Sequence, residues 1–404
     1  MAQALATARR ELSGRVLAAT LRSVRDLDIA EEATADSFLL AVASWPTEGV
    51  PRSMEAWLIT TAKRRAIDRV RRARTAREGL LRLAGGWSEV SEPPGDVAVI
   101  GDDELRMVVL CCDPRIPRTD QVVLTLRLAC GISTAALAAV HGVPTPTMAA
   151  RLTRAKAKLA AAGPDLDLPD DATVDARLPA VAQVVHLAFT LGHTAADGTD
   201  LSDEELQDHA QYLAQVLHSV RPRDPELTGL LALIWLTRAR AATRVGADGD
   251  QVLLAGADRR LWDWAQIERG LGLLTPFVAD PGRSPMVLQA LIAAEHSRAR
   301  RFADTDWRRI LALYDALLTV APAPLFGLGR AIALGHLAGP DTGLADLEQL
   351  ESVIDLSRHP YAAAARGYLL DLSGRREEAM RAWSTAAALA RTAAERRHFA
   401  ARTG

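Results

Sequence analysis

The stretch GISTAALAAVHGVPTPTMAARLTRAKAKL, residues 131–159, decides how the middle of the chain folds. Ser133 or Thr134 can cap a first helix, because a hydroxyl oxygen there accepts a bond from an N–H of the first turn. Gly142 can adopt the positive φ that a tight turn requires. A short apolar helix followed by such a turn and a second helix predicts a helix-turn-helix.

Pro144 or Pro146 can open the second helix, where a missing N–H does no harm. Polar residues early in this helix would meet base edges in the major groove, and later cations would meet phosphates. Ordinary packing of a helix pair is the alternative interpretation. The candidate residues for duplex DNA are Thr145, Thr147, Arg151, Arg154, Lys156 and Lys158.

A second basic segment, KRRAIDRVRRARTAR, covers residues 63–77 and holds eight cations against one acid, Asp68. A helix of this kind binds phosphates, and an aromatic residue just upstream suits single-stranded DNA, whose exposed bases stack. A solvated charged face is the alternative. The candidate residues are Trp57, Thr60, Lys63, Arg64, Arg65, Arg69 and Arg72.

An acidic segment with an apolar stripe, DLDIAEEATADSFL, occupies residues 26–39. Such a helix can dock on a basic partner protein. Packing within its own domain is the alternative. The candidate docking residues are Asp28, Glu31, Glu32, Asp36, Phe38 and Leu39.

Composition places the chain among globular proteins, with 404 residues, 49% hydrophobic and 24% charged. The net charge of −2 confines any nucleic-acid surface to local patches. All three lysines fall in the two basic segments. The cysteines are sparse and odd in number, which is typical of a reduced, cytoplasmic protein. No apolar run is long enough to span a membrane and no signal peptide is evident, so we expect a cytoplasmic protein without membrane contact.

Helical periodicity throughout predicts an all-α chain in three parts. A helical bundle is expected over 1–83, the helix-turn-helix domain over 103–163 and a helical-repeat extension over 172–404. Linkers rich in Gly, Pro and acidic residues are predicted at 84–102 and 164–171.

The extension contains a weak repeat. The stretch from Arg330 resembles the stretch from Arg366, Gly339 corresponds to Gly374, and Ala345 to Ala379. A period near 34 is typical of tetratricopeptide helix pairs, which place a small residue where the two helices cross.

Together the three parts resemble a sigma factor of the extracytoplasmic-function class, in the group with a tetratricopeptide-like extension. AWLITTAKRRAIDRVRR (56–72) is similar to the family's region 2 pattern, and TPTMAARLTRAKAKL (145–159) to its region 4 recognition helix. CCDP, VGADGDQVLL, DTDW and LALYDALLTVAP, at 111–114, 245–254, 304–307 and 311–322, are similar to features of that group's extension.

The resemblance implies a mechanism of transcription initiation. The acidic helix, residues 28–39, would dock on core RNA polymerase. The loop at 46–54 and the helix from Trp57 would capture flipped bases of the −10 element. The recognition helix would read the −35 duplex, and the extension would control these regions in cis by packing or by binding an unidentified ligand or protein.

Other classes of function fit less well. Glu205 and His209 have metal-binding spacing but no third ligand, and Asp248–Asp250 lacks the terminal acid of a calcium loop. We therefore expect no enzyme, no catalytic residue, no metal and no cofactor. The main alternative is a stand-alone helix-turn-helix regulator with a helical-repeat sensor, and a repeat scaffold is the third.

Overall fold

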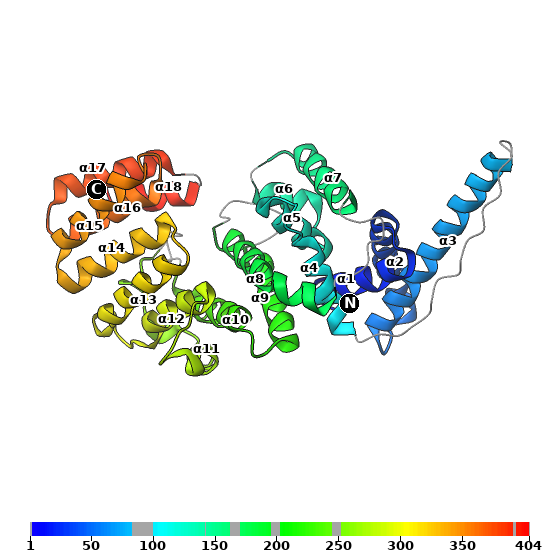
Figure 1. The fold of residues 1–404 in the computed structure, drawn as a ribbon, viewed down its shortest axis with the longest axis horizontal. Helices are drawn as coiled ribbons and strands as arrows, with labels where there is room; N and C mark the ends of the chain where they lie inside the picture. Colours follow the sequence, from blue (N-terminus) through cyan, green and yellow to red (C-terminus); the bar gives the residue numbers. More distant parts are fainter. Residues whose placement is uncertain are drawn as a thin grey trace. The chain divides into compact units, whose positions relative to one another are not determined.

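The computed structural model describes residues 2–82, 100–141, 143–161, 170–194, 203–244, 252–390 and 393–403. Every regular element in these residues is helical, which confirms the all-α prediction (Figure 1). Most of the two predicted linkers, Gly142 and most of segment 245–254 lie outside the described residues. Residues 100–102, which we assigned to the first linker, already belong to a helix.

The chain divides into two compact units, the first ending at Val220 and the second running from Arg221. The first unit begins with three long helices that pack on one another (Figure 1). Trp45 and Leu58 are fully buried between them, together with Val16. The three helices are α1 (Ala2–Val24), α2 (Leu27–Glu48) and α3 (Met54–Arg82).

The loop between α2 and α3 is shorter than the predicted one at 46–54. Pro46 lies inside the last turn of α2, and the helix ends only at Glu48, where Gly49 caps it with a φ of 88° and an N–H bond to the Trp45 carbonyl. Burial of Trp45 against α3 holds this turn helical, so the true loop is 49–53.

The helix-turn-helix is present as α6 (Thr134–Val140) and α7 (Thr145–Ala161). Ser133 caps α6, since its hydroxyl accepts a bond from the Ala136 N–H at 3.1 Å. Met148, Leu152 and Leu159 form the buried stripe of α7. Two further helices, α4 (Ile100–Cys111) and α5 (Arg118–Leu128), complete this domain.

The helix-turn-helix domain lies directly against the first helical bundle. A Cβ atom added to Gly14 of α1 would come within 2.6 Å of the Ala129 carbonyl oxygen at the end of α5. Only glycine permits so close an approach of one backbone to another. The two predicted DNA-binding parts are therefore packed together in this structure.

Two helices that we assigned to the extension also belong to the first unit, namely α8 (Asp171–Thr194) and α9 (Asp203–Val220). Arg177 of α8 bonds Asp113 at 3.2 Å, and Arg118 donates to the Ala180 carbonyl at 3.0 Å. These contacts place the division between compact units about 50 residues later than the domain boundary expected from the linker composition.

The second unit is a series of packed helix pairs (Figure 1). Each copy of the predicted repeat is one such pair, α14 with α15 and α16 with α17, and both turn glycines have a positive φ, 101° at Gly339 and 76° at Gly374. The small residue at the first crossing is Gly343 and not Ala345, which is exposed. The elements are α10 (Pro225–Arg238), η1 (Ala241–Thr243), η2 (Arg259–Leu261), α11 (Trp264–Leu274), η3 (Thr275–Phe277), α12 (Pro285–Arg298), η4 (Phe302–Asp304), α13 (Trp307–Val320), α14 (Pro324–Ala338), α15 (Pro340–Val353), α16 (Pro360–Leu372), α17 (Arg376–Leu389) and α18 (Ala393–Ala400).

Candidate nucleic-acid and polymerase interface

The exposed face of α2 has a spacing that suits contact with another helix. Six of its exposed residues recur at alternating steps of four and three, which places these six along one seam. The seam is acidic in its first half and apolar in its second, where Leu39 is 67% and Val42 53% exposed. The seam consists of Asp28, Glu32, Ala35, Leu39, Val42 and Pro46.

Three of the six predicted docking residues lie on this seam, and three do not. Phe38 is half-buried and packs against the core around Trp45. Asp36 faces α3, where its carboxylate bonds Arg69 at 2.9 Å and lies 3.6 Å from Arg65. Glu31 faces the helix-turn-helix domain. The sequence did not single out Val42, because the periodicity of α2 reads it as a core residue.

Glu31 links the bundle to the helix-turn-helix domain. Its carboxylate forms ion pairs with Arg127 of α5 and Lys156 of α7, and only 16% of its side chain is exposed. Lys156 also lies 3.6 Å from Asp28. A residue predicted to bind polymerase and a residue predicted to bind DNA thus neutralise each other across the domain contact.

Two more cations of α7 are held by Asp120 of α5. Arg151 donates to its carboxylate at 2.7 Å, and Lys158 lies 3.9 Å from it. Thr145, Thr147 and Arg154 are exposed. The predicted recognition helix, α7, therefore exposes its N-terminal polar residues and one cation, while three of its cations form ion pairs with acids of the protein.

The basic helix α3 also has both ion-paired and unpaired cations. Arg65 and Arg69 are ion-paired with α2, and Arg69 also reaches Glu32 at 3.2 Å. Lys63, Arg64 and Arg72 form no ion pair with any described residue, and Thr60 is exposed. The unpaired cations supply the positive charge that a phosphate backbone requires.

Trp57 is half-buried at the start of α3. Its ring meets the buried Trp45 ring edge-on, with centroids 5.6 Å apart. An edge-on contact holds the indole in place and leaves part of its surface exposed. A base could stack there only on the part of the ring that Trp45 leaves open.

Asp113, which ends the CCD sequence, organises the contact between the helix-turn-helix domain and α8. Side-chain and backbone hydrogen bonds from Arg115, and then the charge of Arg177, lower the pKa of its carboxyl to about 2. Cys111 and Cys112 are buried, and burial raises the pKa of the Cys112 thiol to about 12. These thiols are poor nucleophiles at neutral pH because so little thiolate forms.

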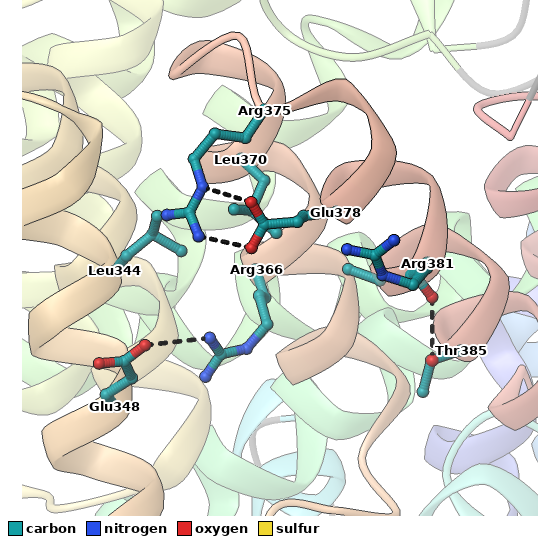
Figure 2. Close-up of a pocket in the computed structure, with 9 residues that line it drawn as sticks. Leu344, Glu348, Arg366, Leu370, Arg375, Glu378, Arg381 and Thr385 are labelled. Atoms are coloured by element: carbon teal, nitrogen blue, oxygen red, sulfur yellow. Dashed lines mark hydrogen bonds and ion pairs between the residues drawn. The ribbon is translucent and has the colours of Figure 1, made fainter.

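The second unit holds a polar pocket of about 370 Å³ between α15, α16 and α17 (Figure 2). Its charged side chains largely pair with one another, Arg375 with Glu378 and Arg366 with Glu348. Arg381, which also lines the pocket, makes no ion pair with a described residue. The pocket is thus close to balanced in charge.

Within the described residues, no three His, Cys, Asp or Glu side chains are grouped so as to hold a metal ion. Among those residues, too, no helix combines the length and apolar character needed to cross a membrane.

Comparison with known proteins matches the three N-terminal helices to a known family. Residues 9–76 match the family described as sigma-70 region 2, and residues 177–277 match a family of unknown function, DUF6596. The uncharacterized protein R00370 of Rhizobium meliloti (strain 1021) is 38% identical over 397 residues, which cover 97% of this chain and 92% of that protein. The crystal structure of yeast Tom70 aligns with 94% of this chain and 80% of its own, at 12% identity and a TM-score of 0.35, which is too low to indicate a shared fold.

Proposed function

We propose that this chain, which belongs to one family with the Rhizobium meliloti protein and matches sigma-70 region 2 over residues 9–76, is a promoter-specific sigma factor of the extracytoplasmic-function class. A sigma-70 region 2 implies binding to core RNA polymerase and to promoter DNA, so we take these two as the partners of this chain. The finer proposal is that it directs the polymerase to particular promoters, opens the −10 element and works in the cytoplasm.

The observation that carries this proposal is the exposed seam of α2 beside the unpaired cations of α3. An apolar and acidic seam with helix-contact spacing suits docking on a partner helix. On the neighbouring helix, Lys63, Arg64 and Arg72 are available to the displaced single strand. A regulator that only binds duplex DNA would have no use for both surfaces.

Substitution on the seam tests the proposal directly. We expect Leu39→Glu to abolish binding to core RNA polymerase from a GC-rich bacterium, because a charge replaces an apolar contact. Val353→Glu is the matched control, since Val353 is 75% exposed and lies in the second unit. Equal core binding by both variants would contradict the proposed docking face, and absence of core binding with intact duplex DNA binding would favour the stand-alone regulator.

We further propose that the extension controls the sigma regions in cis. The supporting contact is that of α8 with the helix-turn-helix domain, where Arg177 pairs with the buried Asp113 and donates to the Val109 carbonyl at 3.4 Å. Arg177→Gln should change the amount of run-off transcript without changing core binding. Unchanged transcription would exclude this contact as the route of control.

A further inference from the structure

Arg259, in the second unit, is a buried arginine to which no described carboxylate is bonded. Only 5% of the residue is exposed. Its Nη1 donates to the carbonyls of His296 at 2.9 Å and Ala299 at 2.6 Å. Its Nε and Nη2 have no hydrogen-bond partner, and no described carboxylate pairs with it. A buried charge costs free energy unless an opposite charge pairs with it, so an anion bound here would stabilise the site.

The two unpartnered nitrogens form the edge of the guanidinium that grips carboxylates elsewhere in this molecule. Arg115 uses Nε and Nη2 to hold Asp113 at 2.9 and 2.8 Å. Arg301 holds Asp304 in the same way, at 2.8 and 2.7 Å. This two-pronged geometry matches the oxygens of a carboxylate or a phosphate.

The groups around Arg259 add positive charge and further polar atoms. Nδ1 of His296 is buried and has no hydrogen-bond partner. Burial first, and then the charges of Arg240 and Arg259, lower the pKa of His296 to about 3. Arg240 is half-buried as a residue and forms no ion pair with a described residue.

The acids nearby are already engaged. Glu295 is 1% exposed and lies 2.7 Å from Arg309 and 3.4 Å from Arg298. Asp304, whose charge reaches Arg259, is held by both prongs of Arg301. The protein itself therefore leaves the charge of Arg259 without a bonded acid.

Aromatic rings flank the same guanidinium. The Cζ atom of Arg259 lies 4.7 Å from the Trp262 ring centroid and 5.9 Å from that of Phe302. Trp262 is fixed by a 2.8 Å bond from its indole N–H to Thr243. These rings hold the guanidinium plane in position, so its free edge is oriented in advance.

We propose that Arg259, Arg240 and His296 form a binding site for an oxyanion, the carboxylate or phosphate group of a small molecule. The anion would bond Nε and Nη2 of Arg259, and Arg240 would add a second positive charge. The proposal specifies the chemical class of the unidentified ligand that the sequence led us to expect at the extension. Its test measures binding to the protein alone, so failure of the proposed sigma activity would leave it standing.

The experiment is calorimetric titration of the full chain with inorganic phosphate and, separately, with acetate at constant ionic strength. Tryptophan fluorescence is a second readout because Trp262 adjoins the site. We expect one anion per chain, and the tighter of the two anions identifies the group. The proposal would be overturned if neither phosphate nor acetate bound, or if sodium chloride gave the same response as these two anions.

Variants of Arg259 and Arg240 test whether the anion binds at these residues. Arg259→Lys keeps the charge but loses the two-pronged edge, and should weaken binding about tenfold or more. Arg260→Lys is the matched control, since Arg260 is exposed and paired with Asp258. If Arg259→Lys does not fold, Arg240→Met leaves the bonds of Arg259 intact and should also weaken binding. Wild-type affinity in Arg259→Lys or Arg240→Met would contradict the assignment.

Discussion

Glu31→Gln should loosen the contact between the N-terminal bundle and the helix-turn-helix domain. In the wild-type protein the Glu31 carboxylate serves Arg127 and Lys156, whose side chains are 26% and 23% exposed. The glutamine keeps the shape of the side chain but removes its charge. Both cations then remain partly buried, without their main acid.

The magnitude follows from the degree of burial. Fully buried pairs cost about 3–5 kcal/mol when one partner is removed, and exposed pairs are worth about 0–1 kcal/mol. The Glu31 cluster lies between these limits, so we expect a loss of about 1–2 kcal/mol. Glu32→Gln is the control, because Glu32 is 66% exposed and contacts only Arg69 among the paired cations; its cost should stay below about 0.5 kcal/mol.

Hydrogen exchange of α7 amides in the full chain, followed by mass spectrometry, reports this local opening. Exchange in α7 should speed up in Glu31→Gln and stay near wild type in Glu32→Gln. Duplex DNA affinity should rise in Glu31→Gln, because Lys156 becomes available to a phosphate. Equal exchange in the two variants, or weaker DNA binding by Glu31→Gln, would refute the reasoning.

Three further predictions concern packing, pH and DNA. Gly229→Ala should destabilise the second unit by roughly 1–3 kcal/mol in urea unfolding, because its Cβ would lie 2.4 Å from the Val287 nitrogen, whereas Gly272→Ala, with open space around it, should not. Asp113 has a lowered pKa, so its contribution to stability is complete above about pH 4 and is lost as pH falls through about 2. Asp113→Asn should lower the unfolding midpoint at pH 7, and its difference from wild type should shrink steadily as the pH falls below about 4. Arg64→Gln should reduce the salt dependence of single-stranded DNA binding by roughly 0.7 in log–log slope, and an unchanged slope would exclude a phosphate contact.

Local patterns were sufficient to predict most of the fold. The Ser133 cap, the prolines at the start of α7 and the repeated glycines of the extension act over a few residues, so the sequence reveals them. Helical periodicity likewise gave the all-α class. The predicted loop after α2 was too long. Pro46 stays helical because Trp45 is buried, and this burial is a tertiary effect that local patterns do not reveal.

The state of the candidate site could not be predicted in the same way. Glu31 and Lys156 are separated by 125 residues in the chain, and nothing local indicates that they meet. The same holds for Asp36 and Arg69, 33 residues apart. The sequence identified which side chains carry charge, whereas only the packed structure separates paired cations from unpaired ones.

The buried cluster around Arg259 shows a further limit of sequence reasoning. Its members come from η2, from α12 and from the residue that precedes η1, and an arginine looks the same in sequence whether exposed or enclosed.

Run-off transcription by core RNA polymerase on the gene's own upstream region tests the central claim most directly. The full chain is compared with Leu39→Glu and with a fragment ending at Val220, where the first compact unit ends. We predict a specific transcript with the full chain, none with Leu39→Glu and an altered amount with the fragment. Equal transcription with and without the full chain would contradict the account.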